Sequence, residues 1–173
     1  VLACDLLGVK SGHRVLDAFA APGGKTAYLT QHMENEGTLI ATDSSDKRLS
    51  RLRENLKRLG VKRPMVRKAD WTEPQPDLDL FDRIVLDVPC SNTGVLRRRV
   101  DLRWRLEPKV FAEMADLQFK LATNVLKQLR PGGRAVYSTC SIEPEENEHL
   151  VDCLLEKDPS LERRGVVRST PQV

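Results

Sequence analysis

The sequence is short of the features that mark membrane-spanning, secreted and zinc-binding proteins. Across its 173 residues, no apolar run approaches the roughly 18 residues that a membrane-spanning helix needs, and no signal-peptide pattern opens the chain. No two of the four cysteines have the CxxC spacing of a zinc site, and disulfides are rare in the cytosol. We therefore expect a cytoplasmic protein with no metal and no membrane partner, in which any cysteine that matters acts as a thiol.

The sequence also lacks a strong excess of charge of one sign. Its 28 basic and 25 acidic residues give a net charge of +3, which by itself does not indicate a nucleic-acid partner. The basic residues are clustered, however, and either cluster could contact phosphates, although the second is more simply a solvated face. The two clusters are Arg97, Arg98, Arg99, Arg103 and Arg105, and then Lys57, Arg58, Lys62, Arg63, Arg67 and Lys68.

Short β-rich runs alternate with helical periods along the chain, which is typical of βαβ units around a parallel sheet. The segment 89–107 has no clean period and is expected to be a long loop, a kind of segment that is usually functional. We predict one doubly wound α/β domain over 1–173, with no repeat and no interdomain linker. The expected strands are 14–17, 38–42, 64–68, 83–86 and 134–138; the expected helices are 26–32, 46–59, 109–129 (closed by Pro131-Gly132-Gly133) and 145–157.

Small residues and two glycines connect the first expected strand to the first expected helix, in VLDAFAAPGGKT (15–26). Glycine there lets the backbone approach a ligand closely, and the start of the helix supplies oriented N–H groups. The segment is neither GxGxxG nor a phosphate-binding P-loop, so it indicates neither a dinucleotide nor a nucleoside triphosphate. From this segment alone, a tight turn that binds no ligand remains an alternative.

Acidic residues follow three of the expected strands, namely Asp43, Asp70 and Asp87. In an open α/β sheet, an acid at the end of the second strand is placed to accept hydrogen bonds from ribose hydroxyls. Each aspartate alone could be an ordinary loop residue. Together with the glycine loop they frame one crevice, which would suit an adenosine with a short charged tail.

Two cysteines also follow strands: Cys90 in DVPCSNTG and Cys140 in STCS. The two strands are neighbours in the usual doubly wound order, so we expect both thiols at the same end of the sheet. Cys4 and Cys153 are expected on apolar helical faces, where a cysteine usually serves as a small packing residue.

A thiolate suits one chemistry in particular, the methylation of a pyrimidine at carbon 5. That carbon is too weak a nucleophile on its own, but a thiolate adding to carbon 6 makes it enamine-like and able to attack a sulfonium methyl group. An acid near the ring nitrogen would help, and Asp87, three residues before Cys90, is placed for this role. The spacing does not rank the two thiols, since DNA cytosine methyltransferases use a PC cysteine as the nucleophile.

The motifs of this chain resemble those of the Sun (Fmu) family of RNA cytosine-5 methyltransferases, from about Val9 to Leu155. The resemblance implies a Rossmann-like S-adenosylmethionine-dependent methyltransferase fold, S-adenosylmethionine as the cofactor, and an RNA substrate, with the bacterial 16S ribosomal RNA enzymes as the nearest branch. The motifs are AAPGGKT (20–26), DVPCSNTG (87–94), RRRVDLRW (97–104) and STCSIEPEENE (138–148).

The resemblance also implies residue roles. Cys140 would be the nucleophile, Cys90 would assist product release, and Asp87 would lie near the methionine end of the cofactor and the target base. Asp43 would bind the ribose and Asp70 would lie near the adenine. The implied cofactor contacts are Phe19, Ala20, Ala21, Pro22, Gly23, Gly24, Lys25, Asp43, Arg48, Asp70 and Asp87.

The sequence departs from the family pattern at three places. Phe19 stands where the family commonly has cysteine, and Asn92 replaces a glycine of PCSGTG; asparagine tolerates a positive φ better than most residues. The family's N-terminal RNA-binding region and its last C-terminal strands are not recognised, so we expect a fragment of a longer protein.

RNA recognition would require the target cytosine to be unstacked, and the arginine-rich loop after Cys90 is the best candidate for phosphate contact. Trp104 could stack on a base or cover the core of its own loop. Two other functions remain open: an inactive cofactor- or RNA-binding module, and the methylation of another RNA such as tRNA. A Rossmann oxidoreductase would need the dinucleotide motif that this sequence lacks.

Overall fold

The computed structural model describes residues 2–34, 36–97 and 107–169. The chain divides into two compact units. The first unit comprises 1–88 and 120–138, and the second comprises 89–119 and 139–173. No helix in the described part of the chain is long and apolar enough to cross a membrane.

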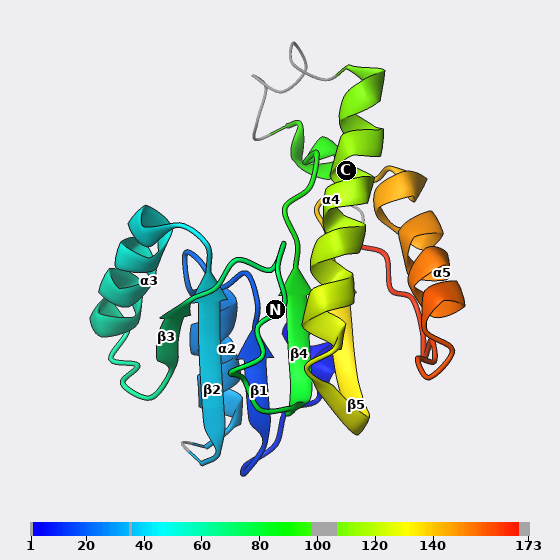
Figure 1. Ribbon diagram of the computed structural model, residues 1–173. Helices are drawn as coiled ribbons and strands as arrows, with labels where there is room; N and C mark the ends of the chain where they lie inside the picture. The colour runs from blue at the N-terminus through cyan, green and yellow to red at the C-terminus, as the bar shows by residue number, and fades with distance from the viewer. Residues whose placement is uncertain (1, 35, 98–106, 170–173) are drawn as a thin grey trace. The chain divides into compact units, whose positions relative to one another are not determined.

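The first unit is built on a parallel sheet of five strands in the order β3-β2-β1-β4-β5 (Figure 1). The chain runs outward from β1 to β3 and then crosses to β4 on the other side of β1, so a switch point lies between β1 and β4. The predicted α/β fold with a parallel sheet is confirmed. The strands are β1 (Arg14–Asp17), β2 (Thr38–Asp43), β3 (Met65–Lys68), β4 (Phe81–Asp87) and β5 (Leu129–Ser138).

Helices cover both faces of this sheet. One face packs against α1 (Leu2–Leu7), α2 (Gly24–His32) and α3 (Asp46–Arg58). The other face lies behind the last turns of α4 (Pro108–Leu126), which pass in front of β4 and β5 in Figure 1. The first core contains Leu7, Val15, Leu29, Leu39, Ala41, Leu49, Leu52, Leu56 and Val85. Strand residues of the opposite parity are also buried, namely Leu16, Ile40, Ile84 and Leu86, as are Leu121, Ala122 and Val125 of α4.

The amphipathic helix α3 shows how the sequence produces these elements. Ser45 caps its first turn by accepting a hydrogen bond from the Arg48 N–H. Leu49, Leu52 and Leu56 recur at helical spacing and are buried, so the other side of the helix faces solvent. The helix ends shortly before Gly60, whose φ of +70° is one that residues other than glycine rarely adopt.

The second unit is mainly helical in its described part. It holds the first part of α4, the short 3-10 helices η1 (Thr93–Val95) and η3 (Pro144–Glu146), and α5 (Glu148–Lys157). The predicted helix 145–157 is therefore two elements, which Asn147 separates with a non-helical backbone (φ −123°, ψ −98°). The predicted loop 89–107 contains η1, and its residues 98–106, including Trp104, lie outside the described residues.

Two predictions were wrong, one about where a helix ends and one about the burial of a cysteine. The Pro131-Gly132-Gly133 run does not end a helix: α4 ends at Leu126, and β5 begins at Leu129 and passes through the run. The pairing of β4 and β5 is irregular there, and a side chain at Gly133 would lie 2.7 Å from the Leu129 side chain, so the glycines allow a bulge within the strand. Cys4 is buried as predicted, but Cys153 is exposed on α5 rather than packed on an apolar face.

Candidate functional site

The glycine loop joins β1 to α2 and is held between the two strands that flank β1. The Ala18 N–H donates to the Val85 carbonyl at 3.1 Å, and the Ala20 N–H donates to the Thr42 carbonyl at 2.8 Å. Gly23 has a φ of +108°, and a Cβ built on it would lie 2.7 Å from Leu52 Cδ1. A Cβ on Gly24 would meet nothing within 4 Å. The loop is thus packed closely at Gly23 and open at Gly24, where α2 presents its first amides.

Asp17 is the last residue of β1 and was not among the predicted site residues. Its side chain is fully buried, and Oδ2 accepts a hydrogen bond from Thr26 Oγ1 at 2.7 Å. Within the described part of the chain, Oδ1 has no hydrogen-bond partner. Burial raises the pKa of this carboxyl from 3.8 to about 6. The acid that ends β1 just before the glycine loop was the sequence signal that could have identified it.

Asp43 ends β2 and is almost fully buried, with 4% of its surface exposed. Its Oδ1 accepts hydrogen bonds from the Ser45 N–H and from Arg48 Nε, both at 2.9 Å. Among the described residues nothing donates to Oδ2, which remains an acceptor for a ligand hydroxyl. The Arg48 guanidinium is hydrogen-bonded to the Asp43 carboxylate, so in this structure Arg48 helps to hold that carboxylate in place.

Asp87 ends β4 and has partners on both carboxylate oxygens. Lys25 Nζ lies 2.5 Å from Oδ2, and Ser138 Oγ donates to Oδ1 at 2.9 Å. The structure therefore joins the glycine loop, β4 and β5 through one carboxylate. Lys25 and Asp87, which were predicted as site residues from two different motifs, form an ion pair.

Asp70, two residues beyond β3, is exposed and bonds to its own turn. Its Oδ1 accepts from the Thr72 N–H at 2.9 Å and from Thr72 Oγ1 at 2.8 Å, and these bonds lower its pKa. The next residue, Trp71, is buried and donates from Nε1 to Thr42 Oγ1 at 2.9 Å. Trp71 was not predicted, yet it anchors the segment that carries Asp70.

In the second unit, the two thiols lie together. The Sγ atoms of Cys90 and Cys140 are 3.0 Å apart, and the Cys140 N–H donates to Cys90 Sγ at 3.3 Å. Cys140 is exposed and Cys90 is partly buried. Asn92, at the position where the family has glycine, adopts a φ of +62°, and its Oδ1 lies 2.9 Å from Cys140 Sγ.

The contact between the thiols changes the acidity of Cys90. The hydrogen bond from the Cys140 thiol is the main cause that lowers the pKa of Cys90 to about 7, and backbone N–H groups add to it, while burial opposes it. At neutral pH a substantial fraction of Cys90 is therefore thiolate, the reactive form of cysteine. The Cys140 thiol has one proton to donate, and both Cys90 Sγ and Asn92 Oδ1 lie within its reach.

The described residues contain no group of three or more His, Cys, Asp or Glu side chains that could hold a metal ion. In the first unit Lys25 pairs with Asp87, and in the second unit Cys90 lies against Cys140. This pattern suits acid–base and nucleophilic chemistry.

Comparison with known proteins identifies the family. A family model described as 16S rRNA methyltransferase RsmB/F matches residues 4–171. The chain belongs to this family. The Ribosomal RNA small subunit methyltransferase B of Salmonella arizonae is 43% identical over 155 residues, which covers 88% of this chain and 36% of the Salmonella protein. The protein of the same name from Klebsiella pneumoniae (strain 342) is 42% identical, with the same coverage.

The RsmB/F match confirms the predicted resemblance to the Sun family. This chain spans about a third of the length of these curated relatives. Among solved structures, NSun6 from Pyrococcus horikoshii with SFG has a TM-score of 0.83 and 39% identity, over 90% of this chain and 40% of that one. A SAM-dependent O-methyltransferase from Thermotoga maritima, at 19% identity, shares the fold alone (TM-score 0.65, 90% of this chain and 48% of that one). The predicted Rossmann-like methyltransferase fold is confirmed.

Proposed function

We propose that this chain carries the cofactor site and the thiol pair of an S-adenosylmethionine-dependent RNA cytosine-5 methyltransferase that acts on 16S ribosomal RNA. The observation that carries the proposal is the thiol pair: two cysteines fifty positions apart in the sequence have Sγ atoms 3.0 Å apart. The RsmB/F relatives support the RNA class. That both compact units act as one catalytic domain over 1–173 stays a prediction.

The carboxyl ends of β1, β2 and β4 suit S-adenosylmethionine. Asp43 Oδ2 is an acceptor for the ribose hydroxyls, and the open space at Gly24 admits a ligand to the first amides of α2. The buried Asp17 and the ion-paired Asp87 add negative charge that complements a sulfonium or ammonium group. SFG, an S-adenosylmethionine analogue, is named with the Pyrococcus relative, which supports this assignment.

When bound, the cofactor supplies an electrophilic methyl group, and the residues of this chain prepare the cytosine to accept it. As the cytosine enters, the proton on Cys140 passes to the Cys90 thiolate. Cys140 Sγ then forms a bond to carbon 6, the ring nitrogen receives through Asp87 a proton from the Lys25 ammonium bonded to it, and carbon 5 becomes nucleophilic. After methyl transfer a base removes the carbon-5 proton, the Cys140–carbon bond breaks, and Cys90 assists this release. The exposed position of Cys140 suits the nucleophile.

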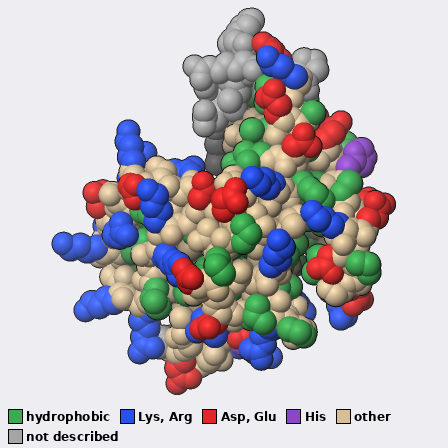
Figure 2. Space-filling view, in the orientation of Figure 1, with side chains coloured by type: hydrophobic (Ala, Val, Ile, Leu, Met, Phe, Trp, Pro, Cys, Tyr) green, Lys and Arg blue, Asp and Glu red, His purple; other side chains and the backbone are tan. Residues whose placement is uncertain are grey.

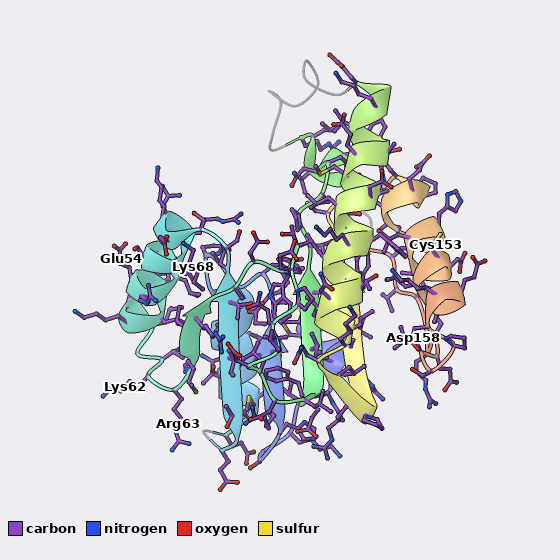
Figure 3. The ribbon with its side chains drawn as sticks, in the orientation of Figure 1. Glu54, Lys62, Arg63, Lys68, Cys153 and Asp158 are labelled. Atoms are coloured by element: carbon purple, nitrogen blue, oxygen red, sulfur yellow. The ribbon has the colours of Figure 1, made fainter. Side chains whose placement is uncertain are left out.

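An RNA substrate also requires a surface for phosphates, and the outer side of α3 and β3 supplies one. Residues 46–68 contain ten basic and two acidic side chains, a net charge of +8 in a chain whose total is +3. Figure 2 shows Lys and Arg side chains gathered over this edge. Lys62 and Arg63 point away from the ribbon in Figure 3. Of the other cluster, 97–105, only Arg97 is described, and it is exposed.

Covalent trapping tests the function. RNA containing 5-fluorocytosine cannot lose its carbon-5 substituent, so a true nucleophile stays attached to it in the presence of S-adenosylmethionine. We expect an adduct, detected by mass, with the wild-type chain and Cys90→Ala but not with Cys140→Ala. Cys153→Ala, which changes another exposed cysteine, is the matched control and should form the adduct.

The other outcomes separate the alternatives. An adduct lost only in Cys90→Ala would exchange the roles of the two cysteines. No adduct in any variant, with the cofactor still bound, would indicate a cofactor-binding module. Comparing ribosomal and transfer RNA that carry the fluorinated base would show which RNA this chain modifies.

A further inference from the structure

A buried carboxylate links the two segments that carry the thiols. Glu146, the last residue of η3, has a fully buried side chain. Its Oε2 accepts hydrogen bonds from the Ser91 N–H at 2.9 Å and from Gln118 Nε2 at 2.7 Å. Its Oε1 accepts from Ser141 Oγ at 2.8 Å and from Ser91 Oγ. All these groups belong to the second unit.

The donors to Glu146 are the immediate neighbours of the two cysteines. Ser91 follows Cys90, and Ser141 follows Cys140. Gln118 of α4 makes a second bond, to the carbonyl of Pro89 at 2.8 Å, so it holds the residue before Cys90 as well. One carboxylate therefore fastens both thiol-bearing segments to each other and to α4.

The two thiol-bearing segments are also joined by direct hydrogen bonds. The Gly94 N–H donates to the Cys140 carbonyl at 2.9 Å, and the Ile142 N–H donates to Thr93 Oγ1 at 3.0 Å. A Cβ on Gly94 would lie 2.8 Å from the Cys140 carbonyl oxygen. The segments are thus in close backbone contact, and the carboxylate lies where both can reach it.

A stabilising role alone does not explain the choice of a charged group. Burying a carboxylate has a large desolvation cost, and apolar residues of similar volume often hold a fold as well or better. A carboxylate adds direction, because it accepts hydrogen bonds with fixed geometry from three chain segments, those of Ser91, Gln118 and Ser141. Direction matters here because the rate of a reaction between positioned groups falls steeply with small displacements.

We propose that Glu146 is a positioning residue that sets the separation of the Cys90 and Cys140 thiols, and with it their joint reactivity. The inference rests on the proposed function for its catalytic meaning, but its geometric content can be tested without RNA. Because the carboxylate is hydrogen-bonded to Ser91 and Ser141, the residues that follow the two cysteines, it acts through them.

The effective concentration of one thiol at the other measures this separation directly. In a glutathione redox buffer, the two thiols and one glutathione disulfide exchange to an intramolecular Cys90–Cys140 disulfide and two glutathione thiols, with no other reactant. Glu146→Ala should lower the effective concentration about 10-fold or more. Glu146→Gln keeps one acceptor oxygen and should fall between that variant and the wild type. The exposed neighbour gives the matched control, Glu145→Ala, which should leave the value unchanged.

A merely structural role predicts a different result. If Glu146→Ala lowers the melting temperature while the effective concentration stays within about 2-fold of wild type, the positioning role is overturned. Should Glu146→Ala fail to fold, Glu146→Gln decides: an unchanged effective concentration in that variant would also overturn the proposal. The outcome is separate from that of the proposed function, because a wild-type chain that forms no adduct with fluorinated RNA still reports its thiol separation.

Discussion

The thiol of Cys140 lies within hydrogen-bonding distance of Cys90 Sγ, with the two sulfurs 3.0 Å apart. This contact lowers the pKa of Cys90 to about 7 and makes the pair, rather than either cysteine alone, the reactive unit at neutral pH. The exposed sulfur and the sulfur with the lowered pKa belong to different residues: Cys140 is exposed, and the pKa of Cys90 is lowered. A division of labour between nucleophile and proton acceptor follows naturally from this difference.

Replacing Cys140 with alanine should raise the pKa of Cys90, because the hydrogen bond from the Cys140 thiol is the main cause of its lowering. The pH dependence of iodoacetamide alkylation at Cys90, followed by peptide mass, should have its midpoint near pH 7 in wild type and above it in the variant. Cys153→Ser should not move the midpoint. An unchanged midpoint in Cys140→Ala would mean that backbone donors alone acidify Cys90.

Asp17 should make the protein less stable as the pH rises from about 4 to about 6. Its pKa is raised from 3.8 to about 6 by burial, so in this window the folded state holds a proton that the unfolded state releases. The free energy of unfolding therefore falls by up to about 3 kcal/mol as the pH rises, at about 1.4 kcal/mol for each pKa unit.

The comparison with Asp17→Asn isolates this contribution. Urea unfolding from about pH 4 to about pH 8 should give a free-energy difference, wild type minus variant, that decreases with pH and is constant above about pH 7. A constant difference over the whole range would show that Asp17 titrates at its ordinary value. Thr26 Oγ1 can still donate to the asparagine oxygen, so the variant retains its main local contact.

Alanine should have different effects on stability at two adjacent glycines. Gly23→Ala places a side chain at a φ of +108° and 2.7 Å from Leu52 Cδ1, so it should lower the free energy of unfolding by about 1–3 kcal/mol. Gly24→Ala meets nothing within 4 Å and should leave stability nearly unchanged, but it fills the open space at the start of α2.

Calorimetric titration with S-adenosylmethionine completes this comparison. We expect Gly24→Ala to weaken binding about 10-fold or more while its melting temperature stays near that of wild type. If binding is unaffected in Gly24→Ala, the cofactor does not occupy that space.

Asp43 and Arg48 should differ in their effect on cofactor affinity. Asp43→Ala removes the acceptor proposed for the ribose and should weaken S-adenosylmethionine binding about 10- to 100-fold. Arg48→Ala removes the ion-pair partner of Asp43 and should weaken S-adenosylmethionine binding less, by no more than about 5-fold. Equal losses in the two variants, measured by calorimetry, would indicate that Arg48 contacts the cofactor directly.

The basic face of α3 and β3 should determine the salt dependence of RNA binding. Neutralising four of its residues should reduce the slope of log affinity against log salt by up to about 3, because each phosphate contact contributes about 0.7 to 0.9. A control variant with the same change in charge elsewhere should keep the wild-type slope; equal slopes in both would make this face a solvated surface. The test variant changes Lys57, Arg58, Lys62 and Arg63 to glutamine, and the control changes Lys10, Lys109, Lys127 and Arg164.

Local patterns in the sequence were enough to predict most of the framework. Alternating β-rich runs and helical leucines, as in α3, specify elements through neighbours a few positions away. The acids at strand ends were placed correctly relative to these elements because parallel strands end at the same edge of a sheet. The positive φ of Asn92 is compatible with the backbone preferences of asparagine, which tolerates this region better than most residues.

The tertiary structure decided which side chains are desolvated and which segments meet. Asp17 is an ordinary strand-end acid in the sequence, and only packing against distant strands and α2 removes it from water. The Arg48 guanidinium is hydrogen-bonded to Asp43, and the run through Gly133 lies in β5, where the pairing with β4 is irregular. Glu146 looks like one more acid in an acidic run. Its bonds to Ser91 and Gln118 arise when segments 55 and 28 positions away fold beside it, and no local pattern encodes such distant contacts.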